Sequence, residues 1–311
     1  MNSSIFSAIL EPFVLILLGY FLSRLTGFPR SLWDGVEKLV YYVLFPPMLF
    51  LSVAQAQWGE LAAGRFVGIG VLAMGFAVLS AYALSRVMTV DRVSDASLRQ
   101  CGYRFNSYIG LALANGLYGP EGGALFALLM GVWVPISNGL ATYDLLQAKH
   151  QKGDLAVVLR SIVTNPLIVA TLLGLVARGL DVALPLLLES VLRRLSSSSL
   201  ALALLSIGAG MMFDVFQRHS RVLLGASIQR LLVVPLVAIV LGHWAGLGGT
   251  ELGVLLAYTA LPTANSCYIL TVRLNGNGPL VADLTSLQSA FALVTLPLWF
   301  MGIHLLGLNG V

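Results

Sequence analysis

Charged side chains are scarce in this sequence. Asp, Glu, Lys and Arg make up 10% of its 311 residues, whereas hydrophobic residues make up 58%. Because a soluble globular domain carries about 25% charged residues, the composition excludes that class. Apolar runs longer than the roughly 18 residues that cross a bilayer recur along the whole chain, and their length excludes the short alternating strands of a transmembrane barrel. The sequence therefore predicts an all-α polytopic membrane protein.

The usual marks of catalysis and of metal binding are also missing. The two cysteines, Cys101 and Cys267, have no metal-ligand spacing, and we expect both to act as small hydrophobic filler. No HExxH motif, GxSxG motif with a partner His, or pair of intramembrane aspartates occurs. We therefore expect no enzyme activity, no cofactor, no metal site and no nucleic-acid partner.

Ten apolar segments bounded by charge, Gly and Pro are candidate transmembrane helices. They span residues 5–26, 34–56, 61–88, 97–118, 123–147, 160–180, 186–213, 220–246, 250–273 and 279–307. The fourth and the ninth are interrupted by polar residues. The first lacks the basic start and the cleavage site of a signal peptide, so we interpret it as a retained helix.

The distribution of Lys and Arg predicts the orientation of these segments. If the N-terminus lies outside, fourteen of the 18 Lys and Arg residues fall on the inner side. The four on the outer side are Arg65, Arg178, Arg193 and Arg194. Because cytoplasmic loops are enriched in Lys and Arg, both termini are expected to face outward.

The two halves of the chain resemble each other. PFVLILLGYFLSR from Pro12 and NPLIVATLLGLVAR from Asn165 share a proline, an apolar run, a glycine and a late arginine. Five helices per half would invert the second half, which gives a first repeat at 1–150 and an inverted repeat at 151–311. Inverted repeats with paired broken helices are typical of secondary transporters, whose site lies where the breaks meet. Chance similarity between apolar helices is the alternative.

The polar interruptions predict the position of the site. The ninth segment contains ALPTANSCYIL, in which Pro262 removes a backbone donor beside uncharged polar side chains, and the fourth contains RFNSYIGLALANG. In hydrocarbon each unsatisfied backbone group costs several kcal/mol, so a break is tolerated where it lines a wet cavity. Helix kinks that serve packing are the alternative. The predicted substrate-binding residues are Asn106, Ser107, Gly110, Pro262, Thr263, Asn265 and Ser266.

At these residues the chain resembles the auxin efflux carrier family, whose bacterial members include proteins described as malonate or malate carriers. The resemblance covers nearly the whole length and rests on LVYYVLFPPMLF, RFNSYIGLALANGLYGPEG, TNPLIVATLLGL, ALPTANSCYILTVRLNG and ADLTSLQSAFALVTLPLW. It implies two inverted five-helix repeats, similar to bile-acid sodium symporters, with crossed and broken helices 4 and 9. Helices 1, 2, 6 and 7 would form a scaffold that often dimerises. Helices 3–5 and 8–10 would form the moving transport part.

The resemblance assigns the family's crossover Asn to Asn106 and its crossover Pro to Pro262. Many relatives have a proline directly before that Asn or a few residues after it, where this chain has Phe105 and the run GLAL from Gly110. The first break is therefore expected to be held open by polar residues and glycine, or to be gentler. The plant carriers' long central loop is replaced by QAKHQKGD at 147–154, which counts against auxin as the substrate.

A small organic anion is the expected substrate, because each exposed helix N-terminus carries about half a positive charge. Arg230, the deepest basic residue, is expected either to draw anions into an inner vestibule or to pair with Asp214 or reach the cytoplasmic edge. Gln288 and Thr285 either line the site, hold a coupling ion or serve packing. No acidic residue is expected at mid-bilayer, which disfavours cation–proton exchange.

The favoured function is a secondary carrier that moves small organic anions, carboxylates above all, by elevator-type alternating access. Efflux is the expected direction, and the expected location is a bacterial inner (plasma) membrane with both termini periplasmic. A membrane-embedded ligand sensor or receptor with the same fold, or a symporter coupled to Na⁺ or H⁺, is the alternative. The lipid bilayer is an expected partner, and the resemblance implies a homodimer through the scaffold helices.

Overall fold

The computed structural model describes residues 3–55, 60–88, 90–148, 164–211 and 220–307, and every regular element in these ranges is a helix. Seven helical segments among them are long and apolar enough to cross a membrane, and a further apolar helix, Pro166–Gly179, is shorter. The prediction of an all-α, multi-pass membrane protein is therefore confirmed.

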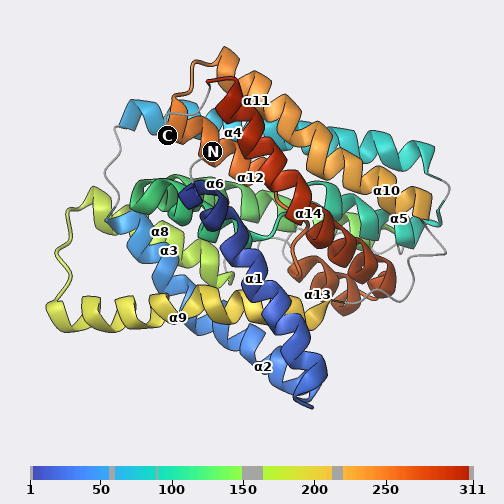
Figure 1. Cartoon of the computed structure of the whole chain (residues 1–311), viewed down its shortest axis with the longest axis horizontal. Coiled ribbons are helices and arrows are strands. Elements are labelled where there is room, and N and C mark those ends of the chain that lie inside the picture. The colour runs from blue at the N-terminus through green and yellow to red at the C-terminus, as the bar shows by residue number, and fades with distance from the viewer. Residues whose placement is uncertain (1–2, 56–59, 89, 149–163, 212–219, 308–311) are drawn as a thin grey trace.

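The helices follow one another along the chain as Figure 1 shows. In order they are α1 (Ser3–Leu25), α2 (Arg30–Leu39), η1 (Val40–Leu44), α3 (Phe45–Ala54), α4 (Glu60–Val87), α5 (Arg92–Arg99), η2 (Gln100–Gly102), α6 (Ser107–Ala148), α8 (Pro166–Gly179), α9 (Leu186–Gly210), α10 (Ser220–Ile228), η3 (Gln229–Val233), α11 (Val234–Trp244), α12 (Gly249–Thr259), α13 (Ser266–Arg273) and α14 (Gly278–Leu305). Two of these names, η1 and η3, mark short π-helical stretches that continue directly into the α-helices on either side.

Most helix ends lie within a few residues of the boundaries predicted from the apolar runs. Residues 160–163, at the start of the sixth predicted segment, lie outside the described residues. A kink at Gly119, whose φ is +61°, divides α6 where the sequence predicts separate fourth and fifth segments. Glycine tolerates this backbone conformation because it has no Cβ.

The fourth predicted segment begins at Arg92 and not near residue 97. Asp91 caps this helix, because its side-chain oxygen accepts the backbone N–H groups of Val93 and Ser94 at 3.0 Å each. Hydrogen bonds from Ser94 also hold the pKa of the Asp91 carboxyl below its usual range. The first turns of α5 are polar, so a search for apolar runs does not detect them.

One group of helices consists of α1, α2, α3, α8 and α9, which lie together from the left to the bottom centre of Figure 1. Within it α1 packs along α9, and α3 packs along α8 and α9. Glycines allow the closest approach: a Cβ added at Gly208 would overlap the backbone oxygen of Ile16, and one added at Gly19 would overlap that of Leu205. Small residues at such crossings are typical of helix packing in membranes.

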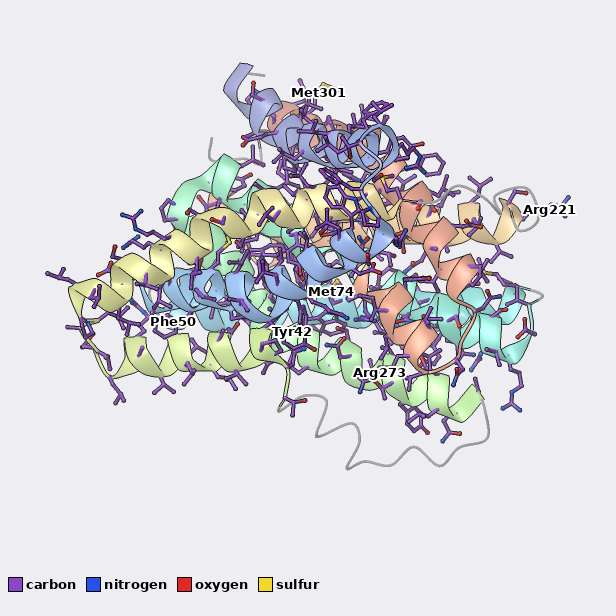
Figure 2. The ribbon with its side chains drawn as sticks, turned by 90° about the horizontal axis from the view of Figure 1, so that it is seen from below. Tyr42, Phe50, Met74, Arg221, Arg273 and Met301 are labelled. Atoms are coloured by element: carbon purple, nitrogen blue, oxygen red, sulfur yellow. The ribbon has the colours of Figure 1, made fainter. Side chains whose placement is uncertain are left out.

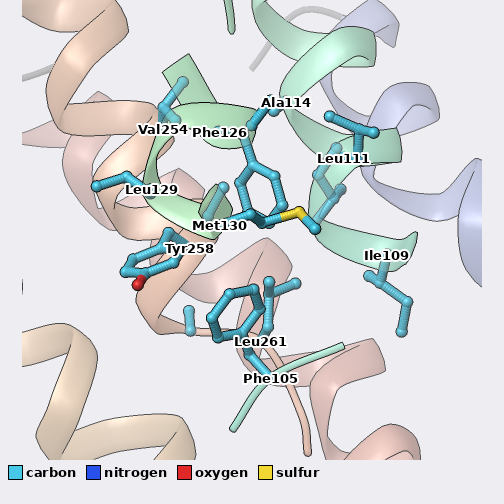
Figure 3. Packing of buried hydrophobic residues seen from close by; sticks show 14 of the residues in the cluster. Phe105, Ile109, Leu111, Ala114, Phe126, Leu129, Met130, Val254, Tyr258 and Leu261 are labelled. Atoms are coloured by element: carbon cyan, nitrogen blue, oxygen red, sulfur yellow. The ribbon is translucent and has the colours of Figure 1, made fainter. Parts of the chain in front are cut away.

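The remaining helices pack around the two interrupted segments of the chain. Their buried centre is an aromatic cluster in which the Phe105 ring lies 4.7 Å from that of Tyr258 and 6.0 Å from that of Phe126 (Figure 3). Met74 of α4 lies near the middle of the molecule, whereas the exposed Arg221 projects from one end (Figure 2). Long apolar helices with exposed basic side chains at their ends are typical of a protein that crosses a bilayer.

The α1–α9 crossing generates the first testable prediction. We expect Gly208→Ala to lower the free energy of unfolding by about 1–3 kcal/mol, because the added methyl group meets rigid backbone of α1. Thermal unfolding of the purified protein in detergent measures the change. Gly75→Ala in α4, where an added Cβ meets no atom within 4 Å, is the matched control and is expected to be neutral or slightly stabilising. Equal melting temperatures for the two variants would contradict the tight crossing.

Candidate functional site

Two interruptions of the helices meet inside the protein. Helical structure ends at Gly102 and resumes at Ser107, and it ends again at Thr259 and resumes at Ser266. The two interrupted stretches touch, because the backbone N–H of Asn106 donates a hydrogen bond of 2.8 Å to the carbonyl oxygen of Pro262. These two residues are the ones that the resemblance assigns to the crossover.

The first interruption contains no proline and depends on Asn106. Its side-chain oxygen accepts the backbone N–H groups of Tyr108 at 3.1 Å and Ile109 at 3.2 Å, so it caps the restarted helix α6. An Asn cap contributes about 0.5–2 kcal/mol compared with Ala. Gly110 does not touch the cavity described below; a Cβ added there would overlap the Phe126 and Leu261 side chains. Its role in the structure is close packing at the crossing.

The carbonyl groups released by the first interruption are paired with side-chain donors. The Thr263 hydroxyl lies 2.7 Å from the Cys101 oxygen, the Trp133 indole N–H donates to the Tyr103 oxygen at 3.0 Å, and Gln229 Nε2 lies 3.5 Å from the Gly102 oxygen. In a membrane interior each unpaired carbonyl would cost several kcal/mol. The buried polar side chains therefore make the broken helix tolerable.

The second interruption is held by Gln288 of α14. Its side-chain oxygen accepts the backbone N–H of Thr263 at 2.9 Å and lies 2.7 Å from the hydroxyl of the same residue. Thr263 and Gln288 are fully buried. These two predicted site residues stabilise the crossover and do not line the cavity described below.

A cavity of about 320 Å³ lies beside the crossover. On one side it is walled by α2, η1 and the start of α8, and on the other by the two interruptions, α13 and the later part of α6. Its polar and charged lining residues are Glu37, Lys38, Tyr41, Tyr42, Arg104, Asn106, Ser107, Tyr108, Ser137, Asn138, Thr142, Asn165, Asn265, Ser266 and Arg273. Of the seven predicted binding residues, four line it: Asn106, Ser107, Asn265 and Ser266.

The electrostatics of this cavity favour an anion. Its lining includes three permanent or near-permanent cations, Lys38, Arg104 and Arg273, against one carboxylate, Glu37. The N-termini of α6 and α13 open at its wall and add partial positive charge. The buried Nδ2 group of Asn106 has no hydrogen-bond partner among the described residues, so it is a free donor there.

Thr285 lies at a separate, smaller cavity. This cavity, of about 40 Å³, is bounded by the end of α9, by α13 and by α14, and Ser286, Ser289 and Asn265 also line it. The Thr285 hydroxyl donates to the backbone oxygen of Val281 at 2.8 Å. Among the described residues no group of three or more His, Cys, Asp and Glu side chains could hold a metal ion.

Arg230 lies away from the large cavity and is fully buried in η3. Its Nη1 atom lies 4.0 Å from the sulfur of Met74, and its Nε and Nη2 atoms have no partner within the described part of the chain. Asp214, the acidic partner considered from the sequence, lies outside the described residues. A buried guanidinium stays charged, so this residue is costly to the fold as described.

Sequence reasoning missed Trp133, Gln229 and Arg104 as parts of the site. The first two serve carbonyl groups that become free only when the helix breaks, and no local pattern signals those contacts. Arg104 was assigned only to the inner charge count, although it stands two residues before Asn106. Its position beside the polar interruption was the signal available.

Comparison with known proteins identifies the class to which this fold and cavity belong. The chain matches the family described as membrane transport protein over residues 4–300, and it therefore belongs to that family. It is 26% identical to an "Uncharacterized transporter" of Methanothermobacter thermautotrophicus over 94% of this chain and 96% of the relative. It is 25% identical to a "Putative malonate transporter" of Rhizobium meliloti over 84% of each chain. The resemblance to the auxin efflux carrier family is confirmed.

The indole of Trp133 provides a test of the first interruption. We expect Trp133→Phe to lower the free energy of unfolding by about 1–3 kcal/mol, because the buried Tyr103 carbonyl loses its donor. Trp33→Phe is the matched control, since the Trp33 Nε1 group has no acceptor among the described residues. Thermal unfolding of both variants measures the difference, and an equal loss at the two positions would contradict the role of Trp133.

The unpaired guanidinium of Arg230 generates the opposite expectation. Arg230→Met is expected to raise the free energy of unfolding by about 1–4 kcal/mol, because it removes a buried charge and places an apolar side chain beside Met74. Arg99→Met is the contrasting variant: Arg99 pairs with Asp95, so this change should destabilise the protein. A lower melting temperature for Arg230→Met would indicate that the guanidinium has a partner in the folded protein.

Proposed function

We propose that this protein is a secondary carrier that moves small organic anions, carboxylates above all, across the membrane. The observation that supports it most is the cavity of about 320 Å³ walled by both helix interruptions. Non-helical backbone at membrane depth is tolerated where it lines a cavity, and in carriers such interruptions form the substrate site. Membership of a membrane transport family agrees with this function.

The anionic substrate class rests on the charges around the cavity. Lys38, Arg104 and Arg273 outnumber the single acid Glu37, and two helix N-termini contribute further positive potential. The proposed substrate-binding residues are those predicted residues that line it: Asn106, Ser107, Asn265 and Ser266. Similarity to a relative named as a putative malonate transporter agrees with a carboxylate substrate.

The proposed architecture is ten transmembrane helices in two inverted repeats, residues 1–150 and 151–311. The boundary at 150 and 151 lies outside the described residues. In the two repeats α1 corresponds to α8, and the α2–α3 segment corresponds to α9. The contact of α1 with α9 therefore has its counterpart in the contact of α8 with the α2–α3 segment, and both contacts occur. The same correspondence maps one interruption onto the other, which supports the repeat.

The proposed mechanism is elevator-type alternating access. The cavity separates the group α1, α2, α3, α8 and α9 from the helices around the crossover, so it lies between a candidate scaffold and a candidate moving part. Exposed apolar side chains on α8, among them Leu172, Leu173 and Val176, suit lipid or a second copy of the chain in a scaffold-mediated homodimer. The proposed location is a bacterial inner membrane with both termini periplasmic.

Efflux needs no coupling ion on energetic grounds. A membrane potential of about 100 mV, negative inside, favours exit of a monoanion by roughly 2.3 kcal/mol. At about 1.4 kcal/mol per tenfold ratio, this potential supports a gradient of roughly fiftyfold. We therefore propose that the protein exports its substrate as a uniporter.

Flux into and out of proteoliposomes tests this function. We expect a potential-driven flux of labelled malonate or malate, and we expect Asn106→Asp to reduce it at least tenfold. Asp caps a helix as well as Asn does, but its negative charge at the cavity wall repels the substrate. The control is Asn277→Asp, the same change at the helix cap of α14 outside the cavity.

Full flux through Asn106→Asp would remove the crossover from the substrate pathway. Carboxylate binding without any flux in the unmodified protein would contradict a carrier and favour a membrane-embedded sensor. Flux that requires a sodium or proton gradient would replace uniport by ion-coupled transport.

A further inference from the structure

Arg104 differs from its neighbour Arg99 in what surrounds its charge. Arg99 forms ion pairs with Asp95 and, at 3.9 Å, with Asp144. Arg104 is 7% exposed and, within the described residues, forms no ion pair with a carboxylate. One arginine is therefore neutralised inside the protein and the other is not.

The hydrogen-bond partners of Arg104 are neutral. Its Nη1 atom donates to the side-chain oxygen of Gln100 at 2.6 Å, and its Nη2 atom donates to the Ser266 hydroxyl at 3.0 Å. These bonds orient the guanidinium but do not balance its charge. Buried charges are normally paired, because an unbalanced one is costly in a low-dielectric environment.

The orientation of Arg104 is fixed by a second set of contacts. Gln100 Nε2 donates to the Thr271 hydroxyl at 2.8 Å, and that hydroxyl donates in turn to the backbone oxygen of Cys267 at 2.7 Å. Helices η2 and α13 thus hold the guanidinium against the cavity that Arg104 lines. A binding group held in this way loses little entropy when a ligand arrives.

The surroundings of Arg104 complete an anion site. Asn106, whose buried Nδ2 group has no hydrogen-bond partner among the described residues, lines the same cavity, as do the N-terminal residues of α6 and α13. Planar guanidinium groups match carboxylates through two parallel hydrogen bonds, which a lysine cannot reproduce. Three features fit one carboxylate group: the guanidinium has no acidic partner in the described part of the chain, its orientation is fixed, and further donors lie nearby.

We propose that Arg104 binds a carboxylate of the transported solute directly and selects charged solutes over neutral ones of the same shape. This inference rests on the proposed function. Lys38 and Arg273, which are more exposed and also line the cavity, contribute only to the general positive potential.

Calorimetric titration of the purified, full-length protein tests the role of Arg104. The probes are malonate, succinate and malate, each compared with its uncharged diamide. We expect Arg104→Gln to weaken carboxylate binding about tenfold to a hundredfold, as for loss of a hydrogen-bonded charge, while the diamide affinity stays unchanged. Arg104→Lys, which keeps the charge but loses the fork, is expected to recover part of the affinity. Lys38→Gln is the control and should weaken binding less than threefold.

The outcomes separate this inference from the proposed function. If the unmodified protein binds none of the three carboxylates, the proposed substrate class is wrong. If the unmodified protein binds the carboxylates, the substrate class stands. The role of Arg104 is then wrong if Arg104→Gln binds them equally well, or if Lys38→Gln loses as much carboxylate affinity as Arg104→Gln does. Should Arg104→Gln fail to fold, Arg104→Lys decides: unchanged carboxylate affinity would overturn the inference, and a loss confined to the carboxylates would support it.

Discussion

The hydrogen bond from the Asn106 N–H to the Pro262 oxygen is the contact on which the rest of the site depends. It pairs a backbone donor and a backbone acceptor that both lie outside the helices and have no partner within a helix. In a membrane such groups are costly when they stay unpaired. Each stretch supplies what the other lacks, since one has a free donor and the other a free acceptor. The two helix starts, Ser107 and Ser266, therefore open beside one cavity with this donor and this acceptor paired to each other.

The polar residues near this junction divide into two tasks. Thr263, Gln288, Trp133 and Gln229 are buried or nearly so and pair with backbone groups of the interruptions. The residues that line the cavity keep donors or charge directed at its contents. Asn106 belongs to both groups, because its side-chain oxygen caps α6 while its Nδ2 group has no hydrogen-bond partner among the described residues. Polar residues of the same stretch, ALPTANSCYIL, therefore have different roles, which depend on the neighbours that each side chain contacts.

Much of the fold could be predicted from composition and apolar runs. The all-helical membrane class and most helix ends follow from segment length, since a bilayer imposes about 20 apolar residues per crossing. The polar start of α5 was missed because it carries an N-cap and charged turns instead of an apolar run. The interruption at Pro262 was predictable from proline chemistry. The one at Asn106 has no proline beside it, so the sequence predicted either a break held open by polar residues and glycine or a gentler one.

The sequence by itself determined that the chain is a helical membrane protein, that its helices break near Asn106 and Pro262, and that polar side chains gather there. These features are local, because hydropathy and backbone restriction act within a few residues. Only the tertiary structure decided which polar residues face the cavity and that Gly110 serves packing. It also decided that Arg99 pairs with a carboxylate whereas Arg104, within the described ranges, does not. Those distinctions depend on helices that are distant in sequence, and no spacing along the chain encodes which of them meet.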